Sequence, residues 1–315
     1  MSIQEDKTNI DLSIVIPVYN EEEVLGELYK RLSRVLNSLA LTYEVIFVDT
    51  SDDKSPEIIA DFHRRDGRYK YLFLSRNFSQ QIAVTAGLDF ASGMAVVIMD
   101  ADLQDPPELI PDLLAKWKKG AEVVYAKREE REKGHFFRKW TARLFYKLIN
   151  KLSPIKFPED TGDFRLLDRK AVLALGELRE TSRYMRGLSV WIGFKQDVVL
   201  FKRGERYKGK THFTVSKALK LAIDGILSFS TVPLRLATYL GLIVAFLGFL
   251  GGLLAIIAKF IPGYIFTGWA TIVVAIFFLG GVQLIILGII GEYVGRIYTE
   301  TRRRPLYIIK EKKGF

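Results

Sequence analysis

The sequence of 315 residues contains no cysteine and only three histidines. Without cysteine, neither a disulfide nor a thiolate metal site can form. The histidines, His63, His135 and His212, are far apart in the chain, which argues against a zinc site. The first eleven residues lack an apolar run, so we expect no secretory signal peptide there.

Charge is missing from two long runs near the C-terminal end. Residues 236–258 carry no charged side chain over 23 residues, and residues 260–291 carry none over 32. Because about 20 apolar residues are enough to cross a bilayer, we predict two transmembrane helices, about 234–258 and 268–292, joined as a tight hairpin. The hairpin region as a whole is expected to occupy residues 232–295.

The basic residues around these runs are distributed unevenly. Arg235 precedes the first run and Arg302 to Arg304 follow the second, whereas the connecting loop contains only Lys259. The positive-inside rule therefore predicts a multi-pass protein of the plasma (inner) membrane with both termini and the globular part in the cytoplasm. The pairs Gly248/Gly252 and Gly291/Gly295 have the spacing of close helix contacts, within the hairpin or between copies in a homo-oligomer.

Outside the two runs the chain is strongly basic, with a formal net charge of +10. Such a balance indicates anionic partners, which could be nucleic acid, phosphorylated metabolites or an acidic membrane surface. Apolar segments rich in β-branched residues alternate with segments of helical periodicity along the first 126 residues. This alternation predicts an α/β fold, a parallel sheet with helices on both faces. The expected strands are 12–20, 43–49, 69–75, 95–99 and 121–126, and the expected helices are 21–39, 56–65, 80–91 and 107–118.

The fourth expected strand leads directly into acidic residues. Asp100, Asp102 and Gln104 follow it and precede two prolines that end the strand. Ligands of open α/β sheets bind at the carboxyl ends of the strands, and alternate residues of an extended segment share a face. Carboxylate and amide oxygens brought together in this way suit Mg²⁺ or a similar hard cation that also holds substrate phosphates. An ordinary acidic loop is the alternative.

Cations and aromatic residues are interleaved between Arg128 and Lys151, with apolar residues at three- and four-residue spacing. The pattern predicts a basic amphipathic helix over 134–151 that lies on an anionic membrane surface. An ordinary helix packed on the core is the alternative. A weaker segment of the same kind, 212–231, is expected to form a juxtamembrane interface helix before the hairpin.

Several motifs together resemble glycosyltransferase family 2. Pro17-Val18-Tyr19-Asn20-Glu21 and Asp100-Ala101-Asp102-Leu103-Gln104-Asp105-Pro106-Pro107 fit its strand-end motifs. Thr161-Gly162-Asp163-Phe164-Arg165-Leu166, Arg206-Tyr207-Lys208-Gly209-Lys210-Thr211 and the hairpin are similar to the polyprenyl-phosphate glycosyltransferases, the dolichol-phosphate mannose synthase group and its bacterial undecaprenyl-phosphate members.

The resemblance implies a Rossmann-like GT-A catalytic domain over residues 1–211 and a basic cytoplasmic tail over 296–315. It implies a nucleotide-sugar donor, with UDP-glucose first, a polyprenyl-phosphate acceptor, Mg²⁺ or Mn²⁺, and no nucleic acid. By position, the metal ligands are Asp100, Asp102 and Gln104, and the acceptor phosphate meets Arg128 and Arg138. The implied nucleotide-sugar contacts are Pro17, Tyr19, Glu21, Asp49, Asp100, Ala101, Arg206 and Lys210.

The remaining candidate catalytic residues are Asp160 and Asp163, beside Asp102. Inverting transferases usually place a carboxylate base behind the acceptor, but a phosphomonoester with a second pKa of about 6 is already ionised at neutral pH. We therefore expect Asp163 or Asp160 to orient neighbouring arginines rather than to act as a base. A helix cap before residues 165–175 is the structural alternative.

Two other functions compete with lipid-phosphate glycosylation. A processive polysaccharide synthase should carry Gln-x-x-Arg-Trp, and none of the glutamines begins that pattern. A non-catalytic nucleotide sensor would not need the intact acid cluster. A lipid-flipping protein should carry polar or charged residues within its spans, and in their interior the sequence has only Gln283 and small hydroxyl residues.

Overall fold

A computed structural model describes residues 10–129, 161–201, 231–258, 260 and 268–315. By its contacts the chain divides into two compact units. One is an α/β domain that includes the last eleven residues, 305–315, and the other contains the two long C-terminal helices.

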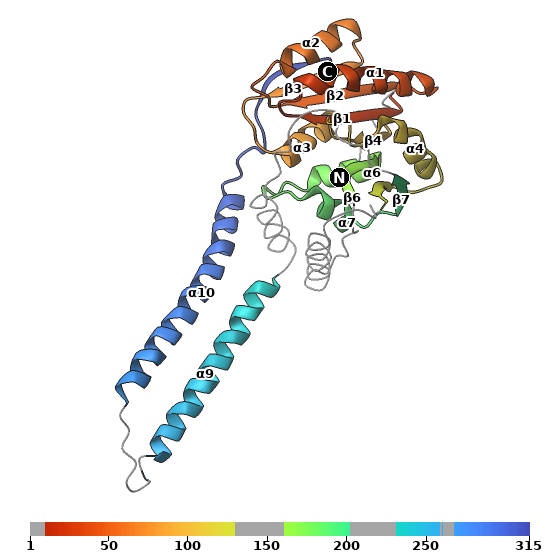
Figure 1. The fold of residues 1–315 in the computed structure, drawn as a ribbon. Coiled ribbons are helices and arrows are strands. Elements are labelled where there is room, and N and C mark those ends of the chain that lie inside the picture. The colour runs from red at the N-terminus through yellow and green to blue at the C-terminus, as the bar shows by residue number, and fades with distance from the viewer. Residues whose placement is uncertain (1–9, 130–160, 202–230, 259, 261–267) are drawn as a thin grey trace. The chain divides into compact units, whose positions relative to one another are not determined.

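The first half of the α/β domain alternates strands and helices as the apolar pattern predicts (Figure 1). Every predicted strand and helix in this half is present, and the boundaries differ by at most three residues. In chain order the elements are β1 (Leu12–Val18), α1 (Glu22–Ser38), β2 (Tyr43–Asp49), α2 (Ser55–Arg65), β3 (Tyr69–Leu74), α3 (Gln80–Phe90), β4 (Ala95–Ile98), η1 (Pro107–Leu109), α4 (Ile110–Lys118) and β5 (Val123–Arg128).

The second half adds β6 (Thr161–Asp168), α6 (Arg169–Glu177), α7 (Met185–Trp191) and β7 (Gln196–Phe201). Together with β8 (Ile309–Lys313), the described strands join one sheet in the order β7-β5-β6-β4-β1-β2-β3-β8. The sheet is mixed, because β6 runs antiparallel to both β4 and β5. β1 and β2 are buried at every residue, on both faces, so both faces of the sheet centre are covered.

The direction of β6 determines where its first residues lie. Since β6 is antiparallel to β4, Arg165 pairs with Ile98 near the end of β4. The start of β6 therefore lies at the same edge as the carboxyl ends of β1, β2 and β4. The predicted alternative, a helix over 165–175 with an acidic cap at 160 or 163, is wrong. The helix begins at Arg169, and the side chain of its cap Asp168 accepts a hydrogen bond from the Lys170 amide at 2.9 Å.

The expected basic tail, 296–315, is not a separate segment. Residues up to Thr301 continue the last helix, and β8 (Ile309–Lys313) pairs antiparallel with β3 at the edge of the sheet. Tyr71 Oη donates to Glu311 at 2.8 Å, and the Phe315 and Phe90 rings stack edge to face at 5.1 Å. The composition of this segment, Ile-Lys-Glu-Lys-Lys, gave no strand signal. Its charges suit an edge strand, where lysines discourage further pairing.

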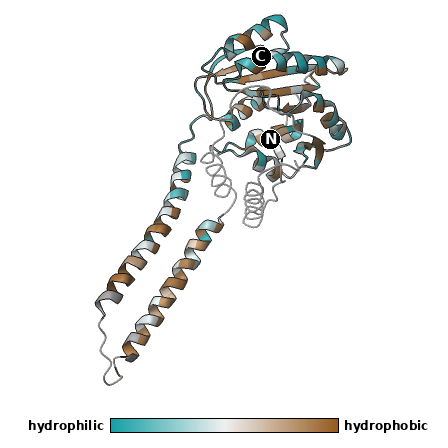
Figure 2. Ribbon diagram, in the orientation of Figure 1, coloured by the Kyte–Doolittle hydropathy of each residue, from teal (hydrophilic) through white to brown (hydrophobic). Residues whose placement is uncertain are grey.

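The second unit consists of α9 (Val232–Ala258) and α10 (Trp269–Thr301). Both are long and apolar enough to cross a membrane, with mean hydropathies of 2.1 and 2.7 in their spanning parts. Figure 2 shows the apolar colouring along both helices. A methyl group added to Gly241 of α9 would lie 3.7 Å from Ile286 of α10. Among the described residues, nothing lies within 4 Å of such a group on Gly248, Gly252, Gly291 or Gly295.

Candidate active site

The loops after β1 and β2 are joined by short polar contacts. Asn20, in the left-handed region with φ 56°, donates its amide to Ser51 Oγ at 2.8 Å, and its side-chain oxygen accepts from the Asp52 amide at 2.9 Å. Ser51 Oγ donates in turn to Asp49 at 2.6 Å. Asn tolerates this backbone conformation better than most residues. The two loops therefore form one rigid surface at the strand ends.

The side chains predicted to contact the nucleotide lie on and beside this surface. Pro17 is buried within β1, whereas Tyr19 is 41% exposed just beyond its end. Glu21 donates its amide to Ser55 Oγ at 3.2 Å, which connects the start of α1 to that of α2. Burial raises the pKa of Asp49 to about 6, against hydrogen bonds from Ser51 that lower it.

The acidic motif lies directly after β4. The Met99 amide still bonds to Val15, but Leu103 has a φ of 59°, so the chain turns here and the alternation of an extended strand does not continue past Asp100. Asp102 is fixed by the turn itself, because its side chain accepts from the Gln104 amide at 3.1 Å. Asp105, three residues further along, is buried and 1% exposed.

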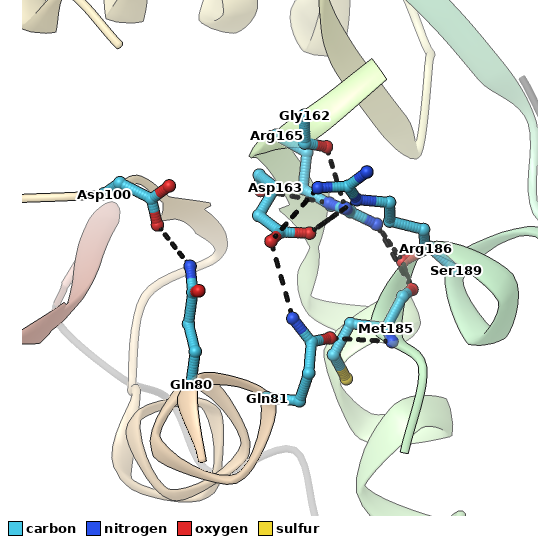
Figure 3. A network of polar contacts seen from close by, with 9 residues as sticks. All are labelled: Gln80, Gln81, Asp100, Gly162, Asp163, Arg165, Met185, Arg186 and Ser189. Atoms are coloured by element: carbon cyan, nitrogen blue, oxygen red, sulfur yellow. Dashed lines mark hydrogen bonds and ion pairs between the residues drawn. The ribbon is translucent and has the colours of Figure 1, made fainter. Parts of the chain in front are cut away.

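Two glutamines at the start of α3 contact two carboxylates, one that follows β4 and one in β6 (Figure 3). Gln80 Nε2 donates to Asp100 Oδ1 at 2.6 Å, and Gln81 Nε2 donates to Asp163 Oδ2 at 3.4 Å. Gln81 also accepts, through Oε1, from the Met185 amide at 3.0 Å. Helix α3 thus connects the end of β4, the start of β6 and the start of α7.

Asp163 lies at the centre of an ionic network. Its Oδ1 accepts from Arg186 Nε at 3.0 Å and from Arg165 Nη2 at 3.2 Å. Arg165 is buried, and it also donates to the Gly162 and Met185 carbonyls and to Ser189 Oγ. Its guanidinium lies 5.4 Å from the centre of the Tyr125 ring. A buried cation with this many acceptors holds β6 and α7 in a fixed relation.

The electrostatics of the two carboxylates beside α3 are opposite. Burial raises the pKa of Asp100 well above its usual value, and the charges of Asp105, Asp163 and Asp102 add to the rise. Burial also acts to raise the pKa of Asp163, but the charges of Arg186 and Arg165 outweigh it and leave the pKa lowered. The site therefore combines an acidic cluster with a carboxylate that stays ionised.

Several predicted site residues are not placed. Asp160, Arg138, Arg206 and Lys210 lie outside the described residues, as do the helices expected over 134–151 and 212–231. Arg128 ends β5, but only its backbone is described. Ala101 is buried in the turn.

Sequence reasoning assigned no site role to four residues of this network, Gln80, Gln81, Arg165 and Arg186, although Arg165 belongs to the 161–166 motif. For the glutamine pair the available signal was its position, because the pair follows the third strand and begins a helix. The strand-end rule applies to that junction as it does to the acidic motif. Arg186 gave no signal, and the motif alone did not indicate that Arg165 is buried, because a charged residue in a sequence is ordinarily read as exposed.

No group of three or more histidine and carboxylate side chains spaced for a metal ion occurs among the described residues. The structure does bring together Asp100 and Asp102, with Asp105 and Asp163 near enough to influence the pKa of Asp100. A cation held here would need further oxygen ligands from Gln104 or from a substrate. The donor set is oxygen-only, as Mg²⁺ and Mn²⁺ prefer.

The α/β domain with acidic residues at its strand ends and the apolar helical pair are the two parts that the motif resemblance leads us to expect. Residues 13–176 match Glycosyl transferase family 2, and residues 232–297 match the GtrB C-terminal hairpin. The chain belongs to glycosyl transferase family 2 and is a membrane protein with that hairpin.

Several relatives match nearly the full length of this chain. An uncharacterized glycosyltransferase, YkcC, of Bacillus subtilis (strain 168) is 47% identical over 97% of this chain and 95% of its own. The bactoprenol glucosyl transferase of Shigella phage SfV is 44% identical over 96% of this chain and 99% of its own. A crystal structure of glucosyl-3-phosphoglycerate synthase from Mycobacterium tuberculosis, 19% identical over 70% of this chain and 78% of that chain, has a TM-score of 0.48, too distant to inform the site.

Proposed function

We propose that this enzyme transfers glucose from UDP-glucose to a polyprenyl phosphate, of the undecaprenyl type, at the cytoplasmic face of the plasma membrane. The observation that carries the proposal is the 44% identity to a bactoprenol glucosyl transferase over nearly the whole of both chains, hairpin included. The basic residues that flank the hairpin, Arg235 and Arg302 to Arg304, support a cytoplasmic catalytic domain.

The reaction is a displacement at the anomeric carbon. The bond from this carbon to the donor diphosphate breaks as a bond to a phosphate oxygen of the lipid forms, and the electron pair leaves with the nucleoside diphosphate. The lipid phosphate is mostly a dianion at neutral pH, so the step requires no strong base. What the enzyme must supply is the close approach of two anions, which needs cationic groups around them.

Asp100, Asp102 and Gln104 would hold Mg²⁺ or Mn²⁺ against the donor diphosphate. Two carboxylates and an amide leave coordination positions for phosphate oxygens. The rise in the pKa of Asp100, which its acidic neighbours increase, supports a site that a cation would complete. When bound, such an ion neutralises charge that develops on the leaving diphosphate.

Asp163 acts as an orienting residue. A general base works best with a pKa near the operating pH, whereas two arginines hold the pKa of Asp163 low and its oxygens accept hydrogen bonds from Arg186, Arg165 and Gln81. Pro17, Tyr19, Glu21 and Asp49 contact the nucleotide. The phosphates are contacted by Arg128, Arg138, Arg206 and Lys210. Asp160 stays a second candidate acid. Association of copies through the hairpin stays a prediction.

The test is transfer by the purified full chain, in detergent, from a panel of radiolabelled nucleotide sugars to undecaprenyl phosphate. We expect labelled lipid with UDP-glucose, little with GDP-mannose, and none in excess EDTA. Asp102→Ala should abolish transfer, while Asp112→Ala, an exposed acid on α4, should retain it. Label from no nucleotide sugar would contradict the proposed activity, and full activity of Asp102→Ala or in EDTA would contradict the metal.

A further inference from the structure

Arg186 is the arginine of the Asp163 network that reaches the surface of the site. It lies in the first turn of α7, and its side chain is 29% exposed, against 1% for Arg165. Its Nε donates to Asp163 Oδ1 at 3.0 Å, and its Nη2 lies 3.5 Å from Oδ2. One edge of the guanidinium is thus fixed against a carboxylate, so the opposite edge, which carries Nη1, is directed away from Asp163.

The neighbouring Arg165 shows what a purely structural arginine looks like here. Its donors are directed to acceptors inside the protein, among them the Met185 carbonyl and Ser189 Oγ. Both acceptors belong to α7, the helix that carries Arg186. Gln81 fixes the first residue of the same helix by accepting from the Met185 amide. Among the described contacts, Asp163 therefore constrains Arg186 through its own side chain, and Arg165 and Gln81 constrain it through its helix.

The surroundings of Arg186 explain why a fixed cation is useful at this point. Asp100, Asp102, Asp105 and Asp163 make the region acidic, and the charge of Arg186 opposes the rise in the pKa of Asp100. A phosphate group that entered an uncompensated acidic cluster would be repelled. A guanidinium already held in place loses little side-chain entropy when it binds such a group, and its planar fork matches two phosphate oxygens.

We propose that Arg186 is a further substrate-contacting residue, which binds a phosphate group of the reacting pair through the guanidinium edge opposite Asp163. This inference rests on the proposed glycosyl transfer, in which a diphosphate leaves and a phosphate monoester attacks. Asp163 and Gln81 are then positioning residues for Arg186. The phosphate could be that of the donor or that of the lipid, since the two share the chemistry that a guanidinium recognises.

The test compares Arg186→Gln, Arg186→Lys and the wild type as full chains in detergent, with UDP-glucose and undecaprenyl phosphate. Arg179→Gln is the matched control, because Arg179 pairs with Asp89 at the other end of α3. We expect Arg186→Gln to lower kcat/KM by about 100- to 1,000-fold, the usual effect of losing one preorganised donor. Arg186→Lys should recover only part of this loss because it cannot form the fork. The control should stay within about threefold, as exposed ion pairs contribute little.

Two further measurements separate a substrate contact from a structural role. Added guanidinium chloride should partly restore transfer by Arg186→Gln and should not stimulate the control. Calorimetric titration with UDP distinguishes the sources of the phosphate. Weaker UDP binding by Arg186→Gln identifies the donor diphosphate, and unchanged UDP binding with a raised KM for the lipid identifies the acceptor.

Retention of more than about one third of the wild-type kcat/KM by Arg186→Gln would overturn the inference, since loss of a real contact costs far more. So would a loss that guanidinium does not restore and that accompanies a lowered melting temperature. Failure of the proposed function is seen separately, because the wild type itself would then label no lipid with any nucleotide sugar.

Discussion

Two buried aspartates lie at the same edge of the sheet and have opposite electrostatic character. Asp49, at the end of β2, is 2% exposed and has a hydroxyl and backbone amides as neighbours, and burial raises its pKa to about 6. Asp163, at the start of β6, is 8% exposed, but two arginines hold its pKa below the usual value. The difference shows that burial alone does not determine the charge of a strand-end acid. The charges supplied by neighbouring elements decide it.

The most damaging change on the Asp163 side should be Arg165→Met. It would leave Asp163 with one arginine fewer, and it would remove the Arg165 hydrogen bond to the Gly162 carbonyl and one of the donors to the Met185 carbonyl. Breaking a buried ion pair from one side typically costs about 3–5 kcal/mol. We expect a loss of that order in the free energy of unfolding of the detergent-solubilised chain, measured by urea titration. Arg179→Met, on the exposed pair with Asp89, is the control and should cost less than about 1 kcal/mol.

The raised pKa of Asp49 should make the free energy of unfolding depend on pH. Because the folded chain raises the pKa of Asp49 from 3.8 to about 6, its contribution is fully present below pH 4 and is lost as the pH rises through about 6. The loss is on the order of 3 kcal/mol. Asp49→Asn should remove this dependence, so its stability curve should be flatter between pH 4 and 7 than that of the wild type. Equal slopes in the two curves would show that Asp49 ionises normally.

Neutralising Asp163 tests whether its low pKa excludes a role as base. We expect Asp163→Asn to lower turnover by less than about 100-fold, because the amide can still accept from one arginine, whereas a true base contributes about 10²–10⁴-fold. Asp102→Asn should lose more. Turnover of the wild type should rise with pH near the lipid phosphate's pKa of about 6 and then stay level. A loss at Asp163→Asn as deep as that at Asp102→Asn, with normal UDP binding, would identify a base.

A third acid, Asp89, extends the comparison, and the change in stability expected there is smaller. Asp89, near the end of α3, accepts from Arg179 at 2.8 Å and from Tyr307 Oη at 2.8 Å. Tyr307→Phe removes one hydrogen bond and should cost about 1 kcal/mol. Amide hydrogen exchange in 309–313 should quicken by less than about tenfold, since the pairing of β8 with β3 is kept. Unchanged exchange in this segment would mean that the hydrogen bond does not help to hold β8.

The parallel half of the sheet could be predicted because its strands are apolar on both faces and its helices have a clear period. Residues 43–49, for example, form a strand with the predicted limits. The strand β6 could not be predicted from its own residues, Thr-Gly-Asp-Phe-Arg-Leu-Leu-Asp. They include Asp163 and Arg165, and this charged pair can be buried only because α7 and α3 provide hydrogen-bonding partners for it. Local composition does not report such long-range compensation. For the same reason the acidic motif was visible in the sequence, whereas Gln81 and Arg186, whose importance depends on contacts, were not.

The pairing of β8 with β3 also has a consequence in time. Tyr71 and its partner Glu311 are separated by 240 residues. At the usual rate of synthesis, about 5–20 residues per second, roughly 10–50 seconds pass between the appearance of β3 and that of β8. During that interval the whole apolar hairpin is made, while the backbone groups of β3 on that side have no strand to pair with. An exposed strand edge is a site of unwanted association, so the newly made domain is most vulnerable while the ribosome is still producing the membrane anchor.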